Sequence, residues 1–150
     1  MASEYTTTRR VEFIDTDMAG IVHFANFYRY MEQAESEFFR SLGLKLLQKR
    51  EDGSSVGWPR LAASCSFRAP AYFEDVITIR LRIVRKSKKT LTMSFEFTRG
   101  ETLVAAGELK TAYCLFRPGE PLVALEMPED FDKSLEAALA EPAGTEPSTP

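Results

Sequence analysis

Residues 15–43, "DTDMAGIVHFANFYRYMEQAESEFFRSLG", contain the pattern that decides the fold of this chain. After Gly20 the apolar residues recur at i, i+4, i+7 and i+11, and they are Phe27, Met31, Ala34 and Phe38. Most positions on the opposite side are polar or charged. This spacing predicts an amphipathic helix over roughly residues 23–42, with Gly43 as its C-cap.

The segments on both sides of this helix alternate between apolar and polar residues, which is typical of strands with one buried face. The first strand is expected over residues 5–14. A polar, Gly- and Ser-rich loop follows the helix over residues 47–59, and four more strands come after it, over residues 60–67, 75–84, 91–97 and 102–116. The residues predicted to share one face in the first two of these four are Leu61, Ala63, Cys65 and Phe67, and then Ile77, Ile79, Leu81 and Ile83.

A helix with one apolar stripe must bury that stripe against another element. Antiparallel strands joined by short turns supply a sheet with one inner face. We therefore predict an α+β domain over residues 1–128, in which a curved antiparallel sheet of about five strands wraps around one long central helix. Residues 129–150 are predicted to form a short C-terminal helix, over 129–141, and a disordered tail.

The composition is that of an ordinary globular domain, with 44% hydrophobic and 27% charged residues and a formal net charge of -3. This charge argues against general binding of polyanions, and no aromatic residues are interleaved with the basic ones as in single-strand nucleic acid binders. Two cysteines favour a reducing compartment. We find no secretory h-region and no apolar run that could cross a bilayer, so we expect a cytoplasmic protein without a membrane partner.

Asp15 and Asp17 lie where the first predicted strand leads into the helix. Backbone N–H groups at a helix N-terminus lack intrahelical partners and carry positive partial charge, so they stabilise anions and polarise carbonyl groups. A carboxylate beside them stays ionised and is usable as a nucleophile or a base. The alternative for either aspartate is a purely structural role in a turn or a helix cap.

The chain resembles the 4-hydroxybenzoyl-CoA thioesterase-like group of hotdog-fold acyl-CoA thioesterases. The resemblance covers roughly residues 5–117 and depends on two passages. The first has the form D-x-D-x-x-G-x-V after an apolar strand, and it is matched by Val11, Phe13, Asp15, Asp17, Gly20, Val22 and Asn26. The second, "FRAPAYFEDVITI", contains a Pro–aromatic–Asp passage, matched by Pro70, Phe73 and Asp75.

The resemblance implies a hotdog fold and hydrolysis of an acyl-CoA thioester to a free acid and coenzyme A. It implies that Asp17 is the catalytic carboxylate and that backbone amides at the start of the helix, above all that of Phe24, polarise the thioester carbonyl. Asp15 is then expected to be structural. The family uses no metal or cofactor, and it forms dimers, often tetramers, with active sites at subunit interfaces.

Further residues are expected to bind the substrate. Those near the helix start or in the long loop would shape the site and its acyl pocket, and they are Gly20, Val22, Phe27, Tyr28 and Trp58. Their aromatic character favours aryl or short acyl groups. A dense basic run could clamp the phosphates of coenzyme A or could be a solvated turn, and it contains Arg85, Lys86, Ser87, Lys88 and Lys89.

His23 is the only histidine, and it could shuttle protons, orient a group or line the pocket. No His, Cys and carboxylate residues have the spacing of metal ligands, and Cys65 and Cys114 fall within predicted strands as expected for inert thiols. The alternative to an enzyme is a hotdog subunit that binds acyl-CoA or a protein partner without turnover.

Overall fold

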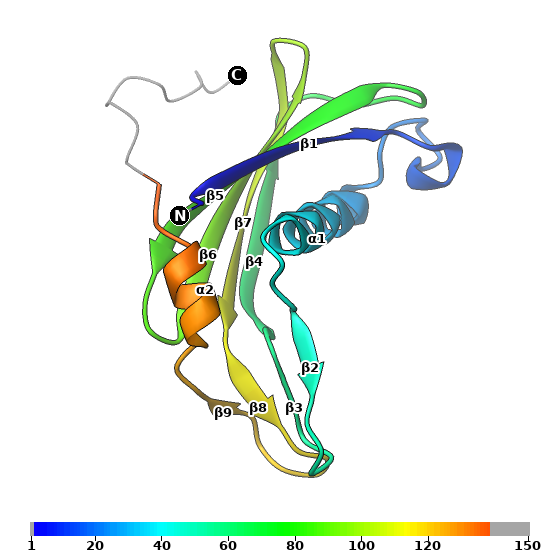
Figure 1. Ribbon diagram of the computed structural model, residues 1–150. Helices are drawn as coiled ribbons and strands as arrows, with labels where there is room; N and C mark the ends of the chain where they lie inside the picture. Colours follow the sequence, from blue (N-terminus) through cyan, green and yellow to red (C-terminus); the bar gives the residue numbers. More distant parts are fainter. Residues whose placement is uncertain (1, 139–150) are drawn as a thin grey trace.

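A single long helix lies across the concave face of a curved antiparallel sheet in the computed structural model, which describes residues 2–138 (Figure 1). The helix is α1 (Phe24–Ser41), and the five-stranded sheet has the order β1-β5-β6-β7-β4. Its strands are β1 (Glu4–Arg10), β4 (Arg60–Phe67), β5 (Val76–Lys86), β6 (Thr90–Arg99) and β7 (Thr102–Ala112). The predicted α+β class, with a curved sheet of about five strands around one helix, is confirmed.

Helix α1 begins and ends close to the predicted residues. His23 is its N-cap, and the chain leaves the helix at Gly43, whose φ of +72° suits glycine. The amide of Leu44 donates to the carbonyl of Phe39 at 2.9 Å, which closes the last turn in a Schellman-like arrangement. The predicted stripe of Phe27, Met31, Ala34 and Phe38 is buried. The helix is about 27 Å long at ~1.5 Å per residue.

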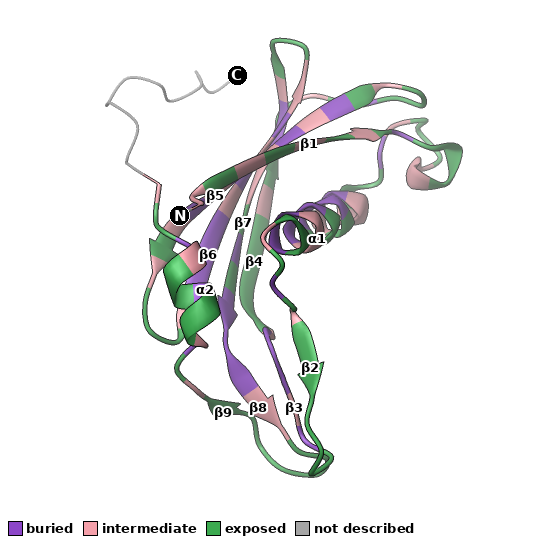
Figure 2. Ribbon diagram, viewed as in Figure 1, coloured by how far each residue is buried: buried purple, intermediate pink, exposed green. Residues whose placement is uncertain are grey.

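The inner face of the sheet supplies the other half of the core, and Figure 2 shows the buried residues gathered between α1 and the strands. The four isoleucine and leucine residues predicted to face inward on β5 are fully buried. Gly107 on β7 faces the helix, because a Cβ added there would lie 3.0 Å from Sδ of Met31 and 3.0 Å from the carbonyl oxygen of Ser64. A glycine at this point therefore allows α1 to lie close to the sheet.

Strand β4 forms one edge of the sheet, and its predicted face is less buried than expected. Cys65 is half-buried, but Leu61 and Phe67 are 56% and 49% exposed. The prediction of one buried face was therefore wrong for most of this strand in the single chain. The reason is that β4 pairs only with β7 in the single chain, so its other edge is open.

A second, four-stranded sheet extends from the end of the first, in the order β2-β3-β8-β9 (Figure 1). Its strands are β2 (Leu47–Lys49), β3 (Ser55–Gly57), β8 (Cys114–Phe116) and β9 (Val123–Ala124). The loop predicted over residues 47–59 thus contains two strands, and the long strand predicted over 102–116 is interrupted at Tyr113. The amide of Tyr113 still bonds to the carbonyl of Lys89 at 2.9 Å, in the register of β6 and β7, but its carbonyl accepts the amide of Leu125 at 2.8 Å, and the chain continues into the second sheet.

Two shorter elements also differ from the prediction. The first predicted strand ends at Arg10, and residues Phe13–Asp15 form the 3-10 helix η1. Helix α2 (Glu129–Ser134) is shorter than predicted, and it buries Phe131 against Phe39 with ring centroids 5.7 Å apart. The tail predicted to be disordered lies outside the described residues beyond Ala138.

A carboxylate on the buried face of α1 was not anticipated. Glu35 is 1% exposed and accepts two hydrogen bonds of 2.8 Å from the guanidinium of Arg60, at the start of β4. Burial raises the pKa of Glu35, and the Arg60 guanidinium counteracts only part of that rise. The pair therefore connects β4, an edge strand of the sheet, to the central helix.

The turn between β4 and β5 is closed by Asp75. Its Oδ2 accepts the backbone N–H of Tyr72 at 2.9 Å and a guanidinium N–H of Arg99 at 3.0 Å. The same Arg99 nitrogen donates to the carbonyl of Pro70 at 2.8 Å. Glu74 next to it has a φ of +72°, a conformation that a non-glycine residue adopts only when its surroundings hold it. The Tyr72 N–H, and then Arg99, lower the pKa of Asp75.

We expect Asp75→Asn to lower the free energy of unfolding at pH 7 by about 1–2 kcal/mol, since it weakens hydrogen bonds made to a charged acceptor. A carboxyl group whose folded-state pKa is lowered contributes stability above its unfolded value, and loses it as the pH falls through the folded value. The deficit should therefore be full at neutral pH and shrink below the ordinary value of 3.8. Urea unfolding at pH 7, 5, 4 and 3 measures it.

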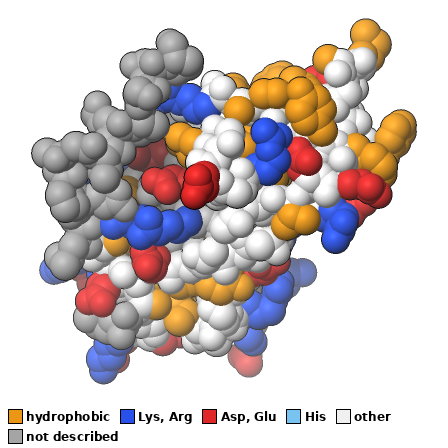
Figure 3. Space-filling model, turned by 90° about the horizontal axis from the view of Figure 1, so that it is seen from above, with side chains coloured by type: hydrophobic (Ala, Val, Ile, Leu, Met, Phe, Trp, Pro, Cys, Tyr) orange, Lys and Arg blue, Asp and Glu red, His pale blue; other side chains and the backbone are white. Residues whose placement is uncertain are grey.

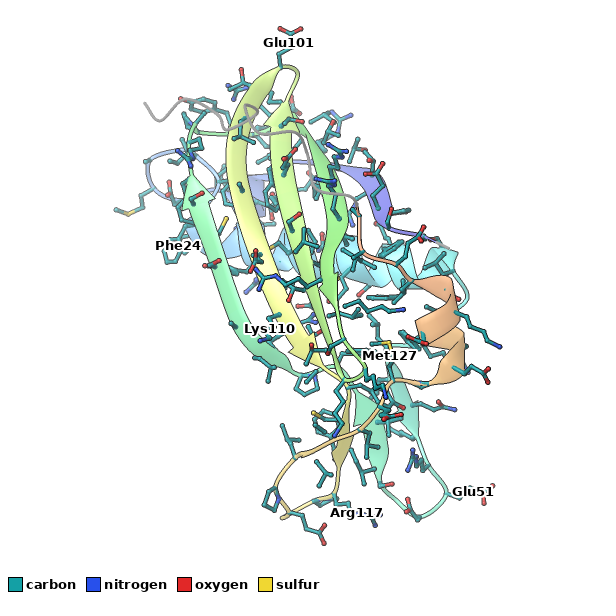
Figure 4. All side chains as sticks on the ribbon, turned by 90° about the vertical axis from the view of Figure 1, so that its left-hand side faces the viewer. Phe24, Glu51, Glu101, Lys110, Arg117 and Met127 are labelled. Carbon is teal, nitrogen blue, oxygen red and sulfur yellow. The ribbon has the colours of Figure 1, made fainter. Side chains whose placement is uncertain are left out.

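Glu101→Gln is the matched control for this experiment, because Glu101 is exposed at the tip of the β6–β7 hairpin (Figure 4). It should change the free energy of unfolding by less than about 0.5 kcal/mol. A deficit for Asp75→Asn that is the same at every pH would show that the charge of Asp75 does not act as described.

Candidate active site

The segment between η1 and α1 is a small hairpin. Thr16 and Val22 form an antiparallel bridge, and the amide of Asp17 bonds to the carbonyl of Ile21 at 2.8 Å. The turn is closed by a 3.0 Å bond from the amide of Gly20 to the carbonyl of Asp17. Gly20 has a φ of +82°, so the glycine of the first motif is explained by the turn.

Asp17 is half-buried and lines the main pocket of the described chain. Its Oδ1 accepts the backbone N–H of Ala19 at 2.8 Å, which fixes the orientation of the carboxylate. No residue among 2–138 donates a hydrogen bond to Oδ2. One carboxylate oxygen is therefore held by the turn while the other is open for chemistry.

Asp15 has a different environment. Its Oδ2 accepts the backbone N–H of Glu12 at 2.9 Å and the hydroxyl of Tyr30 at 3.0 Å. Its carbonyl oxygen accepts the amide of His23 at 2.9 Å and the side-chain amide of Asn26 at 2.7 Å. The predicted acceptance of local backbone hydrogen bonds is therefore present, and Asp15 also bonds to residues of α1 that the sequence did not indicate.

The first turn of α1 leaves one backbone donor open. Nδ1 of His23 accepts the amide of Ala25 at 3.1 Å, and the carbonyl of His23 accepts the amide of Asn26 at 2.9 Å. The amide of Phe24 has no acceptor among the described residues. His23 is thus a helix cap whose exposed ring stacks on that of Phe24, with centroids 4.7 Å apart.

The pocket next to these groups has a volume of about 460 Å³. Its lining residues are Asp17, Ile21, Val22, Phe24, Phe27, Phe67, Arg68, Ala69, Pro70 and Ala71. The ring of Phe67 lies 5.5 Å from that of Phe27 and 6.3 Å from that of Phe24, so three aromatic rings form one wall. Figure 4 shows Phe24 at the side of the molecule next to β4. Phe24 and Phe67 are about half-exposed, so this wall is open on one side.

Phe67 and residues 68–71 line the pocket but were not predicted to do so. The signal that could have found them is the second motif, because "FRAPA" leads from β4 into the turn closed by Asp75. An isolated bridge between Ile21 and Tyr72 brings that turn beside the Asp17 hairpin. The two motifs of the chain therefore form opposite sides of one pocket.

Two of the aromatic residues assigned to the pocket from sequence lie elsewhere. Tyr28 is half-buried on α1 and does not line the pocket. Trp58 is buried, with its ring 5.3 Å from that of Tyr113 and 5.3 Å from that of Phe131. It anchors α2, so we do not propose it as part of the acyl site.

The basic run lies far from Asp17 within one chain. It forms the turn between β5 and β6, beside α2 (Figure 1), whereas the other end of β5 adjoins the pocket. The eleven residues of β5 span about 33 Å at ~3.3 Å per residue. Lys86 is already engaged, since its ammonium group pairs with Asp132 at 2.9 Å and donates to the carbonyl of Leu135 at 2.9 Å.

Other chemistries find little support in the described part of the chain. No three His, Cys, Asp or Glu residues among 2–138 are grouped as metal ligands would be. Burial raises the pKa of the Cys65 thiol to about 11, which keeps it neutral and poorly nucleophilic. No described helix combines the length and the apolar character needed to cross a bilayer.

Comparisons with known proteins find a matching family and relatives over most of this chain. Residues 11–135 match the family model of the thioesterase-like superfamily. The chain is 30% identical to the 4-hydroxybenzoyl-CoA thioesterase of Pseudomonas sp. (strain CBS-3), over 87% of this chain and 96% of that protein. It is 31% identical to the 1,4-dihydroxy-2-naphthoyl-CoA hydrolase of Prochlorococcus marinus (strain MIT 9313), over 87% and 88% of the two chains.

A solved structure extends the likeness to the fold. A variant of 4-hydroxybenzoyl-CoA thioesterase, crystallised with 4-hydroxybenzoyl-CoA, superimposes with a TM-score of 0.73 at 25% identity, over 89% of this chain and 99% of that one. The resemblance inferred from the two motifs is thereby confirmed, as is the hotdog fold. Since the family model spans most of its length, this chain belongs to the thioesterase-like superfamily.

Proposed function

We propose that this protein is an acyl-CoA thioesterase that hydrolyses an aryl-CoA or short-chain acyl-CoA to the free acid and coenzyme A. The observation that carries the proposal is the pairing, at one pocket, of an open carboxylate oxygen on Asp17 with the open amide of Phe24. The names of the two relatives, both hydrolases of aryl-CoA thioesters, support the same reaction class.

Each of the two groups has one role in the hydrolysis. The free oxygen of Asp17 attacks the thioester carbon, or it takes a proton from a water molecule that attacks instead. The carbonyl oxygen gains negative charge in either case, and the N–H of Phe24 at the positive end of α1 stabilises it. The C–S bond then breaks. When water attacks, the acid is released directly and the proton that Asp17 accepted passes to the sulfur of coenzyme A. When Asp17 attacks, the acyl group stays on Asp17 as a mixed anhydride, and water then hydrolyses it, which releases the acid, restores the carboxylate and supplies the proton that the thiolate takes up.

The wall of the pocket favours an aryl group. Phe24, Phe27 and Phe67 present ring faces and edges to a space of about 460 Å³. Aromatic pairs gain about 0.5–1.5 kcal/mol beyond simple burial when they stack offset or edge to face. A flat acyl group can use such contacts, whereas a long alkyl chain gains only burial.

We further propose that two chains complete the site between them, as dimers or as tetramers of such dimers. The open wall of the pocket adjoins β4, whose edge is unpaired in the single chain. Figure 3 shows hydrophobic side chains gathered on the right of the face seen from above, where the Asp17 hairpin lies. Exposed apolar residues gather on η1, on this hairpin and on the turn that leads into β5, and they are Phe13, Ile14, Met18, Tyr72, Phe73 and Val76. A monomer rarely exposes such a patch without a partner.

The basic turn can then act on the substrate of a neighbouring subunit. The turn lies too far along β5 to join the pocket of its own chain, and Lys86 is held by α2. Lys88 and Lys89 are exposed, and Arg85 is exposed at the end of β5. We propose that these three side chains contact the phosphates of a coenzyme A bound at the pocket of another chain.

Asp17→Asn keeps the shape of the side chain but removes its charge, so we expect kcat to fall by about 10²–10⁴ with folding intact. Thiol release from a panel of aryl-CoA and short-chain acyl-CoA substrates measures it, with Glu101→Gln as a surface control. Most of the activity surviving in Asp17→Asn would refute the assigned role. No thiol release from any substrate by the wild type would favour a subunit that binds acyl-CoA without turnover.

Light scattering at micromolar concentration should give a mass of two or four times the 16.9 kDa of one chain. Edge pairing along β4 and burial of the apolar patch are the expected causes. A purely monomeric species that is still fully active would contradict the shared site, and with it the role of the basic turn.

Lys88→Ala combined with Lys89→Ala should raise KM for acyl-CoA and leave kcat nearly unchanged, because contacts to a remote part of the substrate act equally in ground and transition states. The defect should shrink with an acyl-pantetheine, which has no nucleotide. Lys45→Ala combined with Lys49→Ala, another exposed pair, is the control. Equal damage with both substrates would mean that the turn acts on the fold instead.

A further inference from the structure

Tyr30 brings a buried hydroxyl group to the base of the Asp17 hairpin. It is 4% exposed on α1, and its ring packs edge-on against that of Phe27 with centroids 6.0 Å apart. Its hydroxyl donates to Oδ2 of Asp15 at 3.0 Å. Burial, and then this bond to Asp15, raise the pKa of Tyr30 well above its ordinary range. The phenol therefore stays protonated and acts as a donor.

Asp15 joins the hairpin to the helix through four accepted hydrogen bonds. Its carboxylate oxygen holds Tyr30 and the N–H of Glu12, and its carbonyl oxygen holds the N–H of His23 and the side-chain amide of Asn26. The bonds to Asn26 and to His23 are 2.7 and 2.9 Å long. Three of the four donors therefore belong to α1 or to its N-cap, and they fix the last residue of η1, which leads directly into the hairpin, against the start of the helix.

The two groups assigned to the reaction are neighbours of this joint in the chain. Asp17 lies two residues after Asp15, and Phe24 lies one residue after His23. A shift of Asp15 away from the helix would therefore change the distance between the Asp17 carboxylate and the Phe24 amide. Neither Tyr30 nor Asn26 lines the pocket, so neither is placed to touch the substrate.

We propose that Tyr30 and Asn26 are positioning residues. Tyr30 holds the side-chain carboxylate of Asp15 and Asn26 holds its backbone carbonyl, and together they fix the position of the Asp17 carboxylate relative to the Phe24 amide. This inference rests on the proposed function, since it assumes that these two groups do the chemistry. Its physical basis is that a displacement of about 1 Å at reacting groups can cost about 10² in rate even when binding is kept.

Two substitutions remove one donor each while keeping the shape of the side chain. Tyr30→Phe deletes only the hydroxyl. Asn26→Asp replaces the amide donor with a carboxylate that cannot donate to the Asp15 carbonyl, although an acid in the first turn favours the helix itself. Tyr5→Phe is the matched control, because Tyr5 also packs on α1, stacked on Phe38 at 5.7 Å, and its hydroxyl has no partner among residues 2–138.

We expect kcat to fall about 10- to 100-fold in Tyr30→Phe and in Asn26→Asp, with KM within about twofold of wild type. Tyr5→Phe should keep kcat. The melting temperature should fall modestly in both variants, because each loses one hydrogen bond. A loss that appears in kcat with KM kept, in protein that is fully folded at the assay temperature, is what a merely structural role would not produce. In an Asp17→Asn background, Tyr30→Phe should cost little more, because the group that it positions is already missing.

A second readout does not depend on turnover. The amide of His23 is protected by its bond to Asp15, so its hydrogen exchange, followed by NMR, should accelerate about tenfold or more in both variants while core amides of β5 and β6 keep their protection. Exchange and kcat that match those of Tyr5→Phe would overturn the positioning role and leave the proposed function standing. Activity that survives Asp17→Asn would overturn the proposed function, while the exchange experiment would still decide whether Tyr30 and Asn26 hold the hairpin.

Discussion

The burial of α1 against the concave face of the five-stranded sheet is the contact on which the rest of the structure depends. The helix has one apolar stripe and the sheet has one inner face, and in the described residues each covers most of the other. Gly107 allows Met31 to approach the sheet, and this sets how closely the helix lies on the strands. This packing places the N-terminus of α1 next to the hairpin of Asp17, so the candidate site depends on how the helix packs on the sheet.

The two aspartates of the first motif differ in their hydrogen-bond partners. Asp15 accepts hydrogen bonds from Glu12 and Tyr30 through Oδ2, and from His23 and Asn26 through its carbonyl oxygen, which connects the end of η1 to the start of α1. Asp17 lines the pocket and is held through Oδ1, and its Oδ2 has no donor among the described residues. His23 adds to the same arrangement, since by accepting the amide of Ala25 it leaves Phe24 with the open donor at the helix start.

Periodicity predicted the parts of the fold in which one face meets the core along a whole element, such as α1 and β5. It failed where burial depends on distant partners. The short strands β2 and β3 are stabilised by pairing with each other and with β8, which a local pattern does not reveal. Glu35 is read as polar from sequence, and its burial depends on Arg60 at the start of β4. Trp58 was assigned to the site as an aromatic residue of the long loop, but its ring packs against Phe131 in the core beside α2.

The open wall of the pocket and the unpaired edge of the sheet meet at β4. This strand contacts α1 through the Arg60–Glu35 pair and through Phe67, but it pairs only with β7, so Leu61 and Phe67 stay about half-exposed in the single chain. Apolar surface gains about 25 cal/mol for each Å² removed from water. An aryl group in the pocket and a second chain along the edge would each remove part of this exposed apolar surface from water. Phe67 lies where the pocket and the sheet edge adjoin, since it is the last residue of the edge strand β4 and its ring packs against the rings of Phe24 and Phe27.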